Sequence, residues 1–275
     1  MSDQQAITRR QDSPAMKLNQ FLSAKTTNLA TYAKNSIKPA TLIRLAVFEF
    51  SQNEWLQRCS PESVYAALIT AAQLGLEPSG SRGLGYLVPY NGKCTFQPGW
   101  RGLIALALRS KAVKSIYAHV VREGDDFSVQ LGTAPKIHHV PSISGGEERE
   151  VIAAYAVAVL ADGAMDMEVM DLWELERIRK SVAASRGGKD SPAYAQWADQ
   201  MYRKAPIRRL CKRLPLGDDY FAAAHLDEQI ESGKTDVHFD GFIDIQDSEP
   251  TENVSKIQAA ASRRQSMPAI DADTK

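Results

Sequence analysis

Two segments of this sequence concentrate basic side chains and contain no acidic residue. Residues 78–122 hold seven of them: Arg82, Lys93, Arg101, Arg109, Lys111, Lys114 and Arg122. Residues 200–217 hold six more: Arg203, Lys204, Arg208, Arg209, Lys212 and Arg213. Guanidinium and ammonium groups neutralise phosphates, so both segments are candidates for contact with a nucleic-acid backbone.

The first segment also interleaves its cations with aromatic rings. They are Tyr86, Tyr90, Phe96, Trp100 and Tyr117. A ring offers any base a face to stack on, and together with cations this suits sequence-independent binding of single strands. Gly99 and Gly102 flank Trp100 and Arg101, and glycine lets a strand come close to the backbone. We therefore predict a binding role for this pair, whereas core packing is the alternative for Tyr86, Phe96 and Tyr117.

The second segment has the pattern of a helix with one apolar face and one basic face. Its apolar positions i, i+3, i+4 and i+7 are Ile207, Leu210, Cys211 and Leu214. Lys204, Arg208 and Lys212 form an i, i+4, i+8 row, and Arg209 and Arg213 lie alongside it. Like charges at this spacing repel. We expect no acid to compensate this stripe, so that a bound polyanion would relieve the repulsion between its cations. The alternative is a basic face that is merely solvated.

The balancing charges lie elsewhere in the chain. Lys plus Arg equals Asp plus Glu at 33 each, but residues 218–253 hold eleven acids against the one base Lys234. We expect a flexible basic arm over 1–35, a core over 36–225 and an acidic, largely disordered tail over 226–275. Segregation of this kind predicts charged partners.

The sequence offers few catalytic or metal-binding motifs. It has no GxxxxGK[ST], HExxH or paired CxxC, and Gly83 and Gly85 form half of a dinucleotide motif ahead of a strand pattern. His138 and His139 are typical of a surface or strand-end pair rather than a metal site. The three cysteines are widely spaced, which fits a reducing compartment. We predict no catalytic residue and no metal site.

Local signals predict an α+β fold, with a small antiparallel or mixed sheet of hairpins packed by helices. Ser60 and Pro61 begin a helix that Gly75 ends. Hairpins are predicted for 85–90 with 94–97 around Asn91–Gly92, for 115–122 with 127–131, and for 151–161 with 165–170. Asp171 begins a further helix. The apolar run 151–161 is too short to cross a membrane, and a polar start without an apolar stretch favours a cytoplasmic protein.

Five segments, in order, strongly resemble the RecT family of phage and prophage single-strand annealing proteins. They are residues 71–78 (AAQLGLEP), 86–90 (YLVPY), 96–103 (FQPGWRGL), 121–127 (VREGDDF) and 207–216 (IRRLCKRLPL). The resemblance runs from about residue 41 to 216. It implies a core related to phage Red-beta and to eukaryotic annealing proteins, and a role in ATP-independent recombination.

The resemblance also implies how such a protein works and what it meets. Single-stranded DNA lies in a basic groove, copies assemble into rings or helical filaments, and annealing yields a duplex intermediate. The implied partners are an exonuclease and the host single-strand DNA-binding protein, with no membrane. We expect no required cofactor, no ATP, and Mg²⁺ acting through the DNA. The predicted DNA contacts are Lys93, Gln97, Trp100, Arg101, Arg109, Lys111, Lys114, Arg122, Lys204, Arg208, Arg209, Lys212 and Arg213.

Two positions depart from the family pattern, and two other functions stay open. Pro206 stands where the family usually has a small helix-compatible residue, so the basic helix either starts there, which would exclude Lys204 from the stripe, or kinks. Trp100 replaces the more usual tyrosine. The alternatives to annealing are a Mg²⁺-dependent nuclease, whose carboxylates would be Glu123, Asp125 and Asp126, and an oligomeric scaffold without DNA activity.

Overall fold

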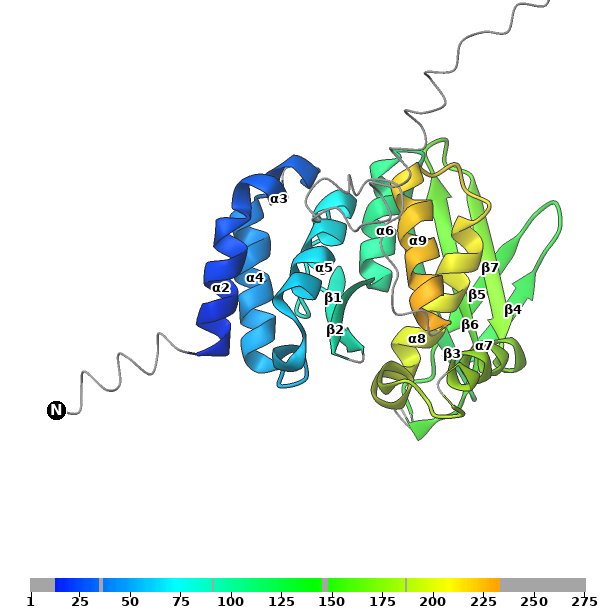
Figure 1. Cartoon of the computed structure of the whole chain (residues 1–275). Helices are drawn as coiled ribbons and strands as arrows, with labels where there is room; N and C mark the ends of the chain where they lie inside the picture. The colour runs from blue at the N-terminus through cyan, green and yellow to red at the C-terminus, as the bar shows by residue number, and fades with distance from the viewer. Residues whose placement is uncertain (1–12, 35–36, 91, 145–147, 186, 233–275) are drawn as a thin grey trace, which may run out of the picture. The chain divides into compact units, whose positions relative to one another are not determined.

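A computed structural model describes residues 13–34, 37–90, 92–144, 148–185 and 187–232. Its elements, in order, are α2 (Pro14–Ala24), α3 (Thr26–Tyr32), α4 (Pro39–Gln52), the 3-10 turn η1 (Leu56–Arg58), α5 (Pro61–Leu74), β1 (Gly85–Tyr90), β2 (Lys93–Pro98), α6 (Trp100–Arg109), β3 (Val113–Arg122), β4 (Asp126–Gln130), β5 (Lys136–Val140), β6 (Val151–Leu160), β7 (Met165–Asp171), α7 (Leu172–Ala184), α8 (Pro192–Cys211) and α9 (Asp218–Glu231) (Figure 1). The fold is α+β, as the sequence pattern predicts.

Helix ends lie where local signals place them. The Ser60 hydroxyl accepts the Ser63 N–H at 3.2 Å and begins α5, and Gly75 ends that helix in the left-handed region at φ 63°. The Asp171 carboxylate accepts the Glu174 N–H at 2.8 Å and begins α7. These three predictions are confirmed.

Two of the three predicted hairpins form. β1 pairs antiparallel with β2 from Gly85↔Pro98 to Tyr90↔Lys93, around a turn whose Asn91 lies outside the described residues. β6 pairs antiparallel with β7, and β3 lies on the other side of β6 in a three-stranded sheet of order β3-β6-β7. The sheets are small and antiparallel.

The predicted hairpin of 115–122 with 127–131 is wrong. β3 pairs with β6, from Val113↔Leu160 to Arg122↔Val151, and β4 pairs with β5 instead. β3 and β6 have the same length of ten residues, so their pairing extends over nearly the whole of both strands. The Asp125 carboxylate accepts the N–H groups of Arg122 and Ser142, which fixes the turn that leads the chain away from β3.

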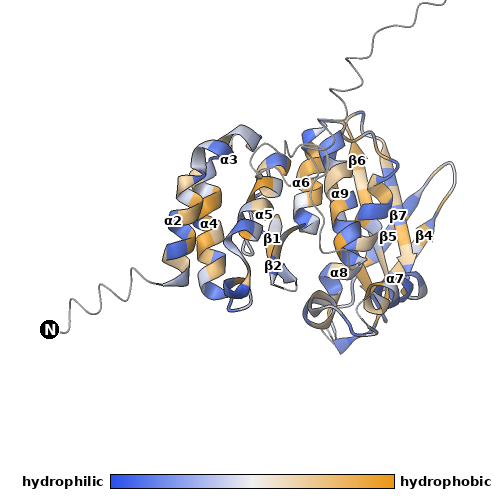
Figure 2. Ribbon diagram, in the orientation of Figure 1, coloured by the Kyte–Doolittle hydropathy of each residue, from blue (hydrophilic) through white to orange (hydrophobic). Residues whose placement is uncertain are grey.

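The β3-β6-β7 sheet is covered on both faces. Helices α7 and α8 pack on one face, where Ala154 and Met170 contact Leu175, Tyr194 and Tyr202 (Figure 1). On the other face, Phe127 and Ile137 of the β4–β5 hairpin pack against a cluster that includes Tyr155. β6 is apolar along much of its length (Figure 2), as expected for a central strand buried on both faces. One sheet face therefore positions α8.

The arm expected over residues 1–35 differs from the structure. From Pro14 it forms α2 and α3, and Leu18, Leu22 and Leu29 are almost completely buried against α4 and α5. Leu18 and Leu22 are spaced i, i+4 and lie on one helix face, so burial outweighs the polar composition of the arm. Residues 1–12 lie outside the described residues.

The boundary expected at residue 226 also shifts. Helix α9 continues to Glu231, and Tyr220, Leu226 and Ile230 are buried along its inner face. The first acids of the predicted tail therefore belong to the folded core, and residues 233–275 lie outside the described residues. None of the helices in the described ranges is both long and apolar enough to cross a membrane.

Candidate functional site

Helix α8 carries the second basic segment from residue 200 to Cys211, and Lys212 and Arg213 follow directly after its end. Ser191 begins it by accepting the Tyr194 N–H at 3.3 Å, and non-helical angles at Trp197 (φ −138°, ψ 43°) mark a kink. Pro206 lies inside the helix and is buried, and the helix continues to Cys211. The helix therefore neither starts nor shows non-helical angles at Pro206, and Lys204 stays on the same helix as Arg208.

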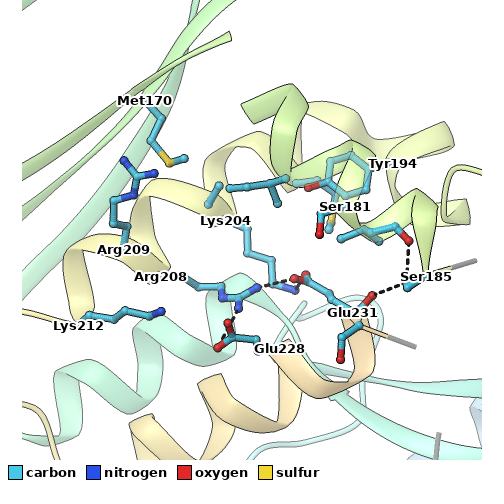
Figure 3. A pocket seen from close by; sticks show the side chains of 15 residues that line it. Met170, Ser181, Ser185, Tyr194, Lys204, Arg208, Arg209, Lys212, Glu228 and Glu231 are labelled. Carbon is cyan, nitrogen blue, oxygen red and sulfur yellow. Dashed lines mark hydrogen bonds and ion pairs between the residues drawn. The ribbon is translucent and has the colours of Figure 1, made fainter. Parts of the chain in front are cut away.

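Two cations of α8 are neutralised by acids of α9. The Lys204 ammonium lies 2.6 Å from Asp227 Oδ1 and 2.9 Å from Glu231 Oε1. Arg208 lies 2.5 Å from Glu231 Oε2 and 3.8 Å from the more exposed Glu228 (Figure 3). Lys204 is only 5% exposed and Asp227 is completely buried. This network is part of the α8–α9 contact.

Mutual attraction favours the ionised forms of Lys204 and Glu231 despite their burial, whereas at Asp227 burial outweighs the neighbouring cations and raises the pKa of the carboxyl group. Burial lowers the pKa of Lys204, but Asp227 and Glu231 outweigh it and hold that pKa above its usual value. Burial raises the pKa of Glu231, but Lys204 and Arg208 outweigh it and lower that pKa to about 2. Buried charges persist when they are paired and hydrogen-bonded, so these residues are a structural unit.

The remaining arginines of the stripe pair with the sheet and with α7. Arg209 lies 3.2 Å from Glu168 on β7 and 2.8 Å from Glu174 on α7. Arg213 lies 3.1 Å from Asp166 and also pairs with Glu168. The expectation of a stripe without compensating acids is therefore wrong. Of its five cations, Lys212 alone has no ion pair with the residues that the structure describes.

Three predicted contacts of the first segment are also used within the protein. Arg109 donates to the carbonyls of Leu74 and Gly75 at 2.6 Å each, at the end of α5. Arg122 donates to the Arg149 carbonyl at 2.6 Å and pairs with Asp199. Gln97 donates to Asp227 at 3.2 Å. These side chains hold elements together.

The other predicted residues of this segment reach the surface. Lys93, Arg101, Lys111 and Lys114 are exposed, and Trp100 is half-buried. The Arg101 guanidinium lies over the Trp100 ring, with 5.3 Å between its Cζ and the ring centroid. A guanidinium over an indole face is a favourable cation–π arrangement.

The glycines around Trp100 serve internal packing. A Cβ added to Gly99 would lie 2.2 Å from the Gly83 carbonyl oxygen, and one on Gly102 would lie 2.0 Å from that of Leu84. The close approach that we expected with DNA is therefore made with the protein's own 83–84 loop. The glycines give no support to a binding role of Trp100.

A pocket of about 430 Å³ opens beside the α8 stripe, between α7, α8 and α9 (Figure 3). Lys204, Arg208, Arg209 and Lys212 line it, and Glu228 and Glu231 face them from α9. Its other lining residues are Met170, Ile178, Ser181, Val182, Ser185, Tyr194, Met201, Ala205 and Ser232. The structure thus gathers four of the predicted DNA contacts at one opening, and it leaves those of the first segment outside it.

The carboxylates of the nuclease hypothesis do not form a metal site. Asp125 is 3% exposed and accepts hydrogen bonds from Arg149 at 2.6 Å and from two backbone N–H groups, and His139 lies 3.0 Å from it. Within the described ranges, no group of three or more His, Cys, Asp or Glu side chains is arranged to hold a metal ion. The oxygens of Asp125 stabilise the turn before β4.

Comparison with known proteins decides the family. A profile described as "RecT family" matches residues 40–239. The chain belongs to the RecT family. It is 37% identical over 196 residues to "Protein RecT" of Escherichia coli strain K12, which covers 68% of this chain and 71% of that protein. It is 38% identical over 76 residues to "Uncharacterized protein YqaK" of Bacillus subtilis strain 168, covering 28% and 27%.

Membership of the RecT family implies annealing of single-stranded DNA in recombination, and proteins of this family are generally not catalysts. The matched range contains both basic segments and all of α9. Sequence reasoning missed the acids that neutralise α8. Asp227 and Glu231 are spaced i, i+4, as are Lys204 and Arg208. Residues at this spacing share one face of a helix, so an acidic pair and a basic pair could have suggested that the two helices face each other.

Proposed function

We propose that this chain binds single-stranded DNA and anneals complementary strands without ATP, in recombination of the phage type. The observation that carries the proposal is the RecT family match over residues 40–239, which spans the described core from α4 to the end of α9. Annealing requires no covalent chemistry, because base pairing supplies the free energy once two strands are aligned.

The exposed cations give this proposal its physical basis. Lys111 and Lys114 follow α6 and are open to solvent, and Arg101 and Lys93 are exposed nearby in sequence. Lys212 adds a fifth exposed cation at the end of α8. Contacts with phosphates through such side chains are independent of sequence and sensitive to salt, as an annealing protein requires.

The finer parts of the proposal concern assembly and partners. We propose that copies of the chain assemble into rings or helical filaments on DNA, and that an exonuclease and the host single-strand DNA-binding protein act beside it. No cofactor is required, and Mg²⁺ acts by screening the DNA. The E. coli relative bears the name RecT, and the shared sequence supports transfer of its family's activity to this chain.

One experiment tests the proposal directly. The full chain is incubated with labelled complementary oligonucleotides and Mg²⁺, without ATP, and the products are separated on native and denaturing gels. The expected result is annealed product formed faster than without protein. Shortened strands would instead indicate the nuclease, and unchanged strands would leave the scaffold; either result contradicts the proposal.

A further inference from the structure

The pocket between α7, α8 and α9 has two kinds of wall. Met170, Ile178, Val182 and Met201 give it an apolar side, backed by the core that joins α7 and α8 to the sheet. Cations of α8 and acids of α9 give it a charged rim. Binding sites for small organic groups have this form, with an apolar wall and a few polar groups, and volumes of roughly 300–1,000 Å³.

The charged rim has room for one anion rather than for a row of phosphates. Three of its four cations already contact carboxylates: Lys204, Arg208 and Arg209. Lys212 is exposed and forms no ion pair with any described residue. A phosphate at Lys212 gains a partner without displacing a carboxylate, whereas a phosphate at the other three must compete with one.

The acids of α9 fix the side on which that anion can lie. Glu231 and Glu228 line the pocket next to Arg208, and in Figure 3 Lys212 lies on the other side of Arg208 from Glu231. The Glu228 side chain is 59% exposed and therefore carries its negative charge at the opening. A phosphate is repelled from the α9 rim and attracted to Lys212, so a bound nucleotide has one favoured orientation.

We propose that this pocket binds one unstacked nucleotide of a single DNA strand, with the base against Ile178 and Met201 and its phosphate at Lys212. This inference rests on the proposed function and adds a site for a base to it. In a duplex the bases are paired and stacked, so the apolar wall is out of their reach. The pocket therefore distinguishes single strands from duplexes by binding a base. The balanced charges of α8 cannot make this distinction.

The test measures how much of the affinity comes from bases. Fluorescence anisotropy compares a labelled oligothymidylate with a strand of the same length and phosphates whose thymidines are replaced by abasic units. For the full chain we expect the oligothymidylate to bind about tenfold more tightly. Ser181→Phe places a ring in the pocket from the exposed face of α7, and we expect the preference to fall to about twofold.

Ala184→Phe is the matched control. Ala184 is exposed on the same helix and does not line the pocket, so this variant should keep the tenfold preference. Binding by Ser181→Phe with an unchanged preference, next to normal annealing by the unmodified chain, overturns the pocket and leaves the proposed function intact. Failure of the unmodified chain to bind either strand contradicts the proposed function itself.

A second measurement needs no variant and decides the matter if Ser181→Phe does not fold. A strand carrying 5-iododeoxyuridine is crosslinked to the unmodified chain by light, and the crosslinked peptides are identified by mass spectrometry. Crosslinks at residues 170–185 or 194–205 support a base in the pocket. Crosslinks confined to other segments, such as residues 86–117, overturn it.

Discussion

The cations of α8 and those that follow α6 look equivalent in the sequence and differ in the structure. Lys204, Arg208 and Arg209 contact carboxylates of α7, α9 and β7 at 2.5–3.2 Å. Lys111 and Lys114 are exposed and form no ion pair with the described residues. A run of basic residues without nearby acids in the sequence therefore does not determine the electrostatic potential at the surface where a ligand binds.

The difference arises from where the two segments lie in the fold. α8 packs against the sheet on one side and contacts α6 and α7 as well, and the ion-pair partners of the basic stripe are 19 to 47 residues away in the sequence. Lys111 lies in the bend after α6 and Lys114 at the start of β3, and both residues are exposed. We infer that the α8 cations mainly stabilise the fold and that the exposed cations mainly hold DNA.

The largest expected effect tests the structural role of α8. Lys204→Met removes the buried ammonium that Asp227 and Glu231 share, and leaves Arg208 beside both carboxylates. Breaking a buried pair in this way costs about 3–5 kcal/mol. Urea denaturation followed by circular dichroism should show this loss of unfolding free energy.

Lys212→Met is the control for that measurement. It removes the same charge from an exposed position directly after the end of α8. Surface changes of this kind alter stability by about 0.5 kcal/mol or less. Equal stability of the two variants would show that the α8–α9 ion pairs contribute nothing to the fold, and the comparison between the two regions would fail.

Parts of the fold that depend on neighbouring residues could be predicted from the sequence. Ser60, Gly75 and Asp171 end or begin helices through their own side chain or backbone angles, and the Asn91–Gly92 hairpin depends on its turn. The pairing of β3 with β6 could not be predicted in this way. It depends on burying two strands whose paired ends, Val113 and Leu160, are 47 residues apart, and no local signal marks it.

The candidate site shows the same division. The row of Lys204, Arg208 and Lys212 follows from helical spacing and is present. Its neutralisation was missed because Asp227 and Glu231 belong to a segment that reads as a polar tail, although Leu226 and Ile230 give that segment a buried face. Sequence composition averages over both faces of such a helix, whereas packing depends on one.

Gly102→Ala extends the comparison to the backbone of the first segment. The new methyl group would lie 2.0 Å from the Leu84 carbonyl oxygen, inside α6 where the helix meets the 83–84 loop. Overpacking of this kind typically costs about 1–3 kcal/mol. Thermal melting should show a lower Tm even without DNA. A variant with unchanged Tm and weaker DNA binding would instead indicate that Gly102 contacts DNA.

Asp125→Asn tests a second set of charges that the protein neutralises internally. Burial opposes ionisation of Asp125, but hydrogen bonds from Arg122 N–H, Arg149, His139 and Ser142 N–H outweigh it and hold its pKa well below 3.8. A carboxyl with a depressed pKa stabilises the fold above its unfolded-state value and loses that contribution as the pH falls through the folded-state value.

The expected result is therefore a pH-dependent difference between the two proteins. At pH 7, Asp125→Asn should be about 2 kcal/mol less stable, the magnitude of hydrogen bonds to a charged group. The difference should shrink as the pH falls below about 4, because protonation then removes the same contribution from the unmodified chain. Urea midpoints from pH 7 to pH 3 measure it, and a gap that stays constant would contradict the assignment.

The smallest expected effect separates the two regions by their response to salt. Single strands lose affinity with salt at a log–log slope of about −0.7 per neutralised phosphate, so four to six contacts give roughly −3 to −4 per protomer. Lys111→Gln combined with Lys114→Gln should reduce this slope by about 1.4 in magnitude. Arg209→Gln combined with Arg213→Gln should reduce it by less than half as much. A phosphate at these arginines displaces a carboxylate, which then recruits a cation from solution and offsets the counterions released by DNA.

Titrations of a labelled oligonucleotide between 50 and 300 mM salt, roughly the range in which screening changes most, measure both slopes. Equal reductions in the two double variants would mean that the ion pairs of α8 open onto DNA, and the two regions would then act alike.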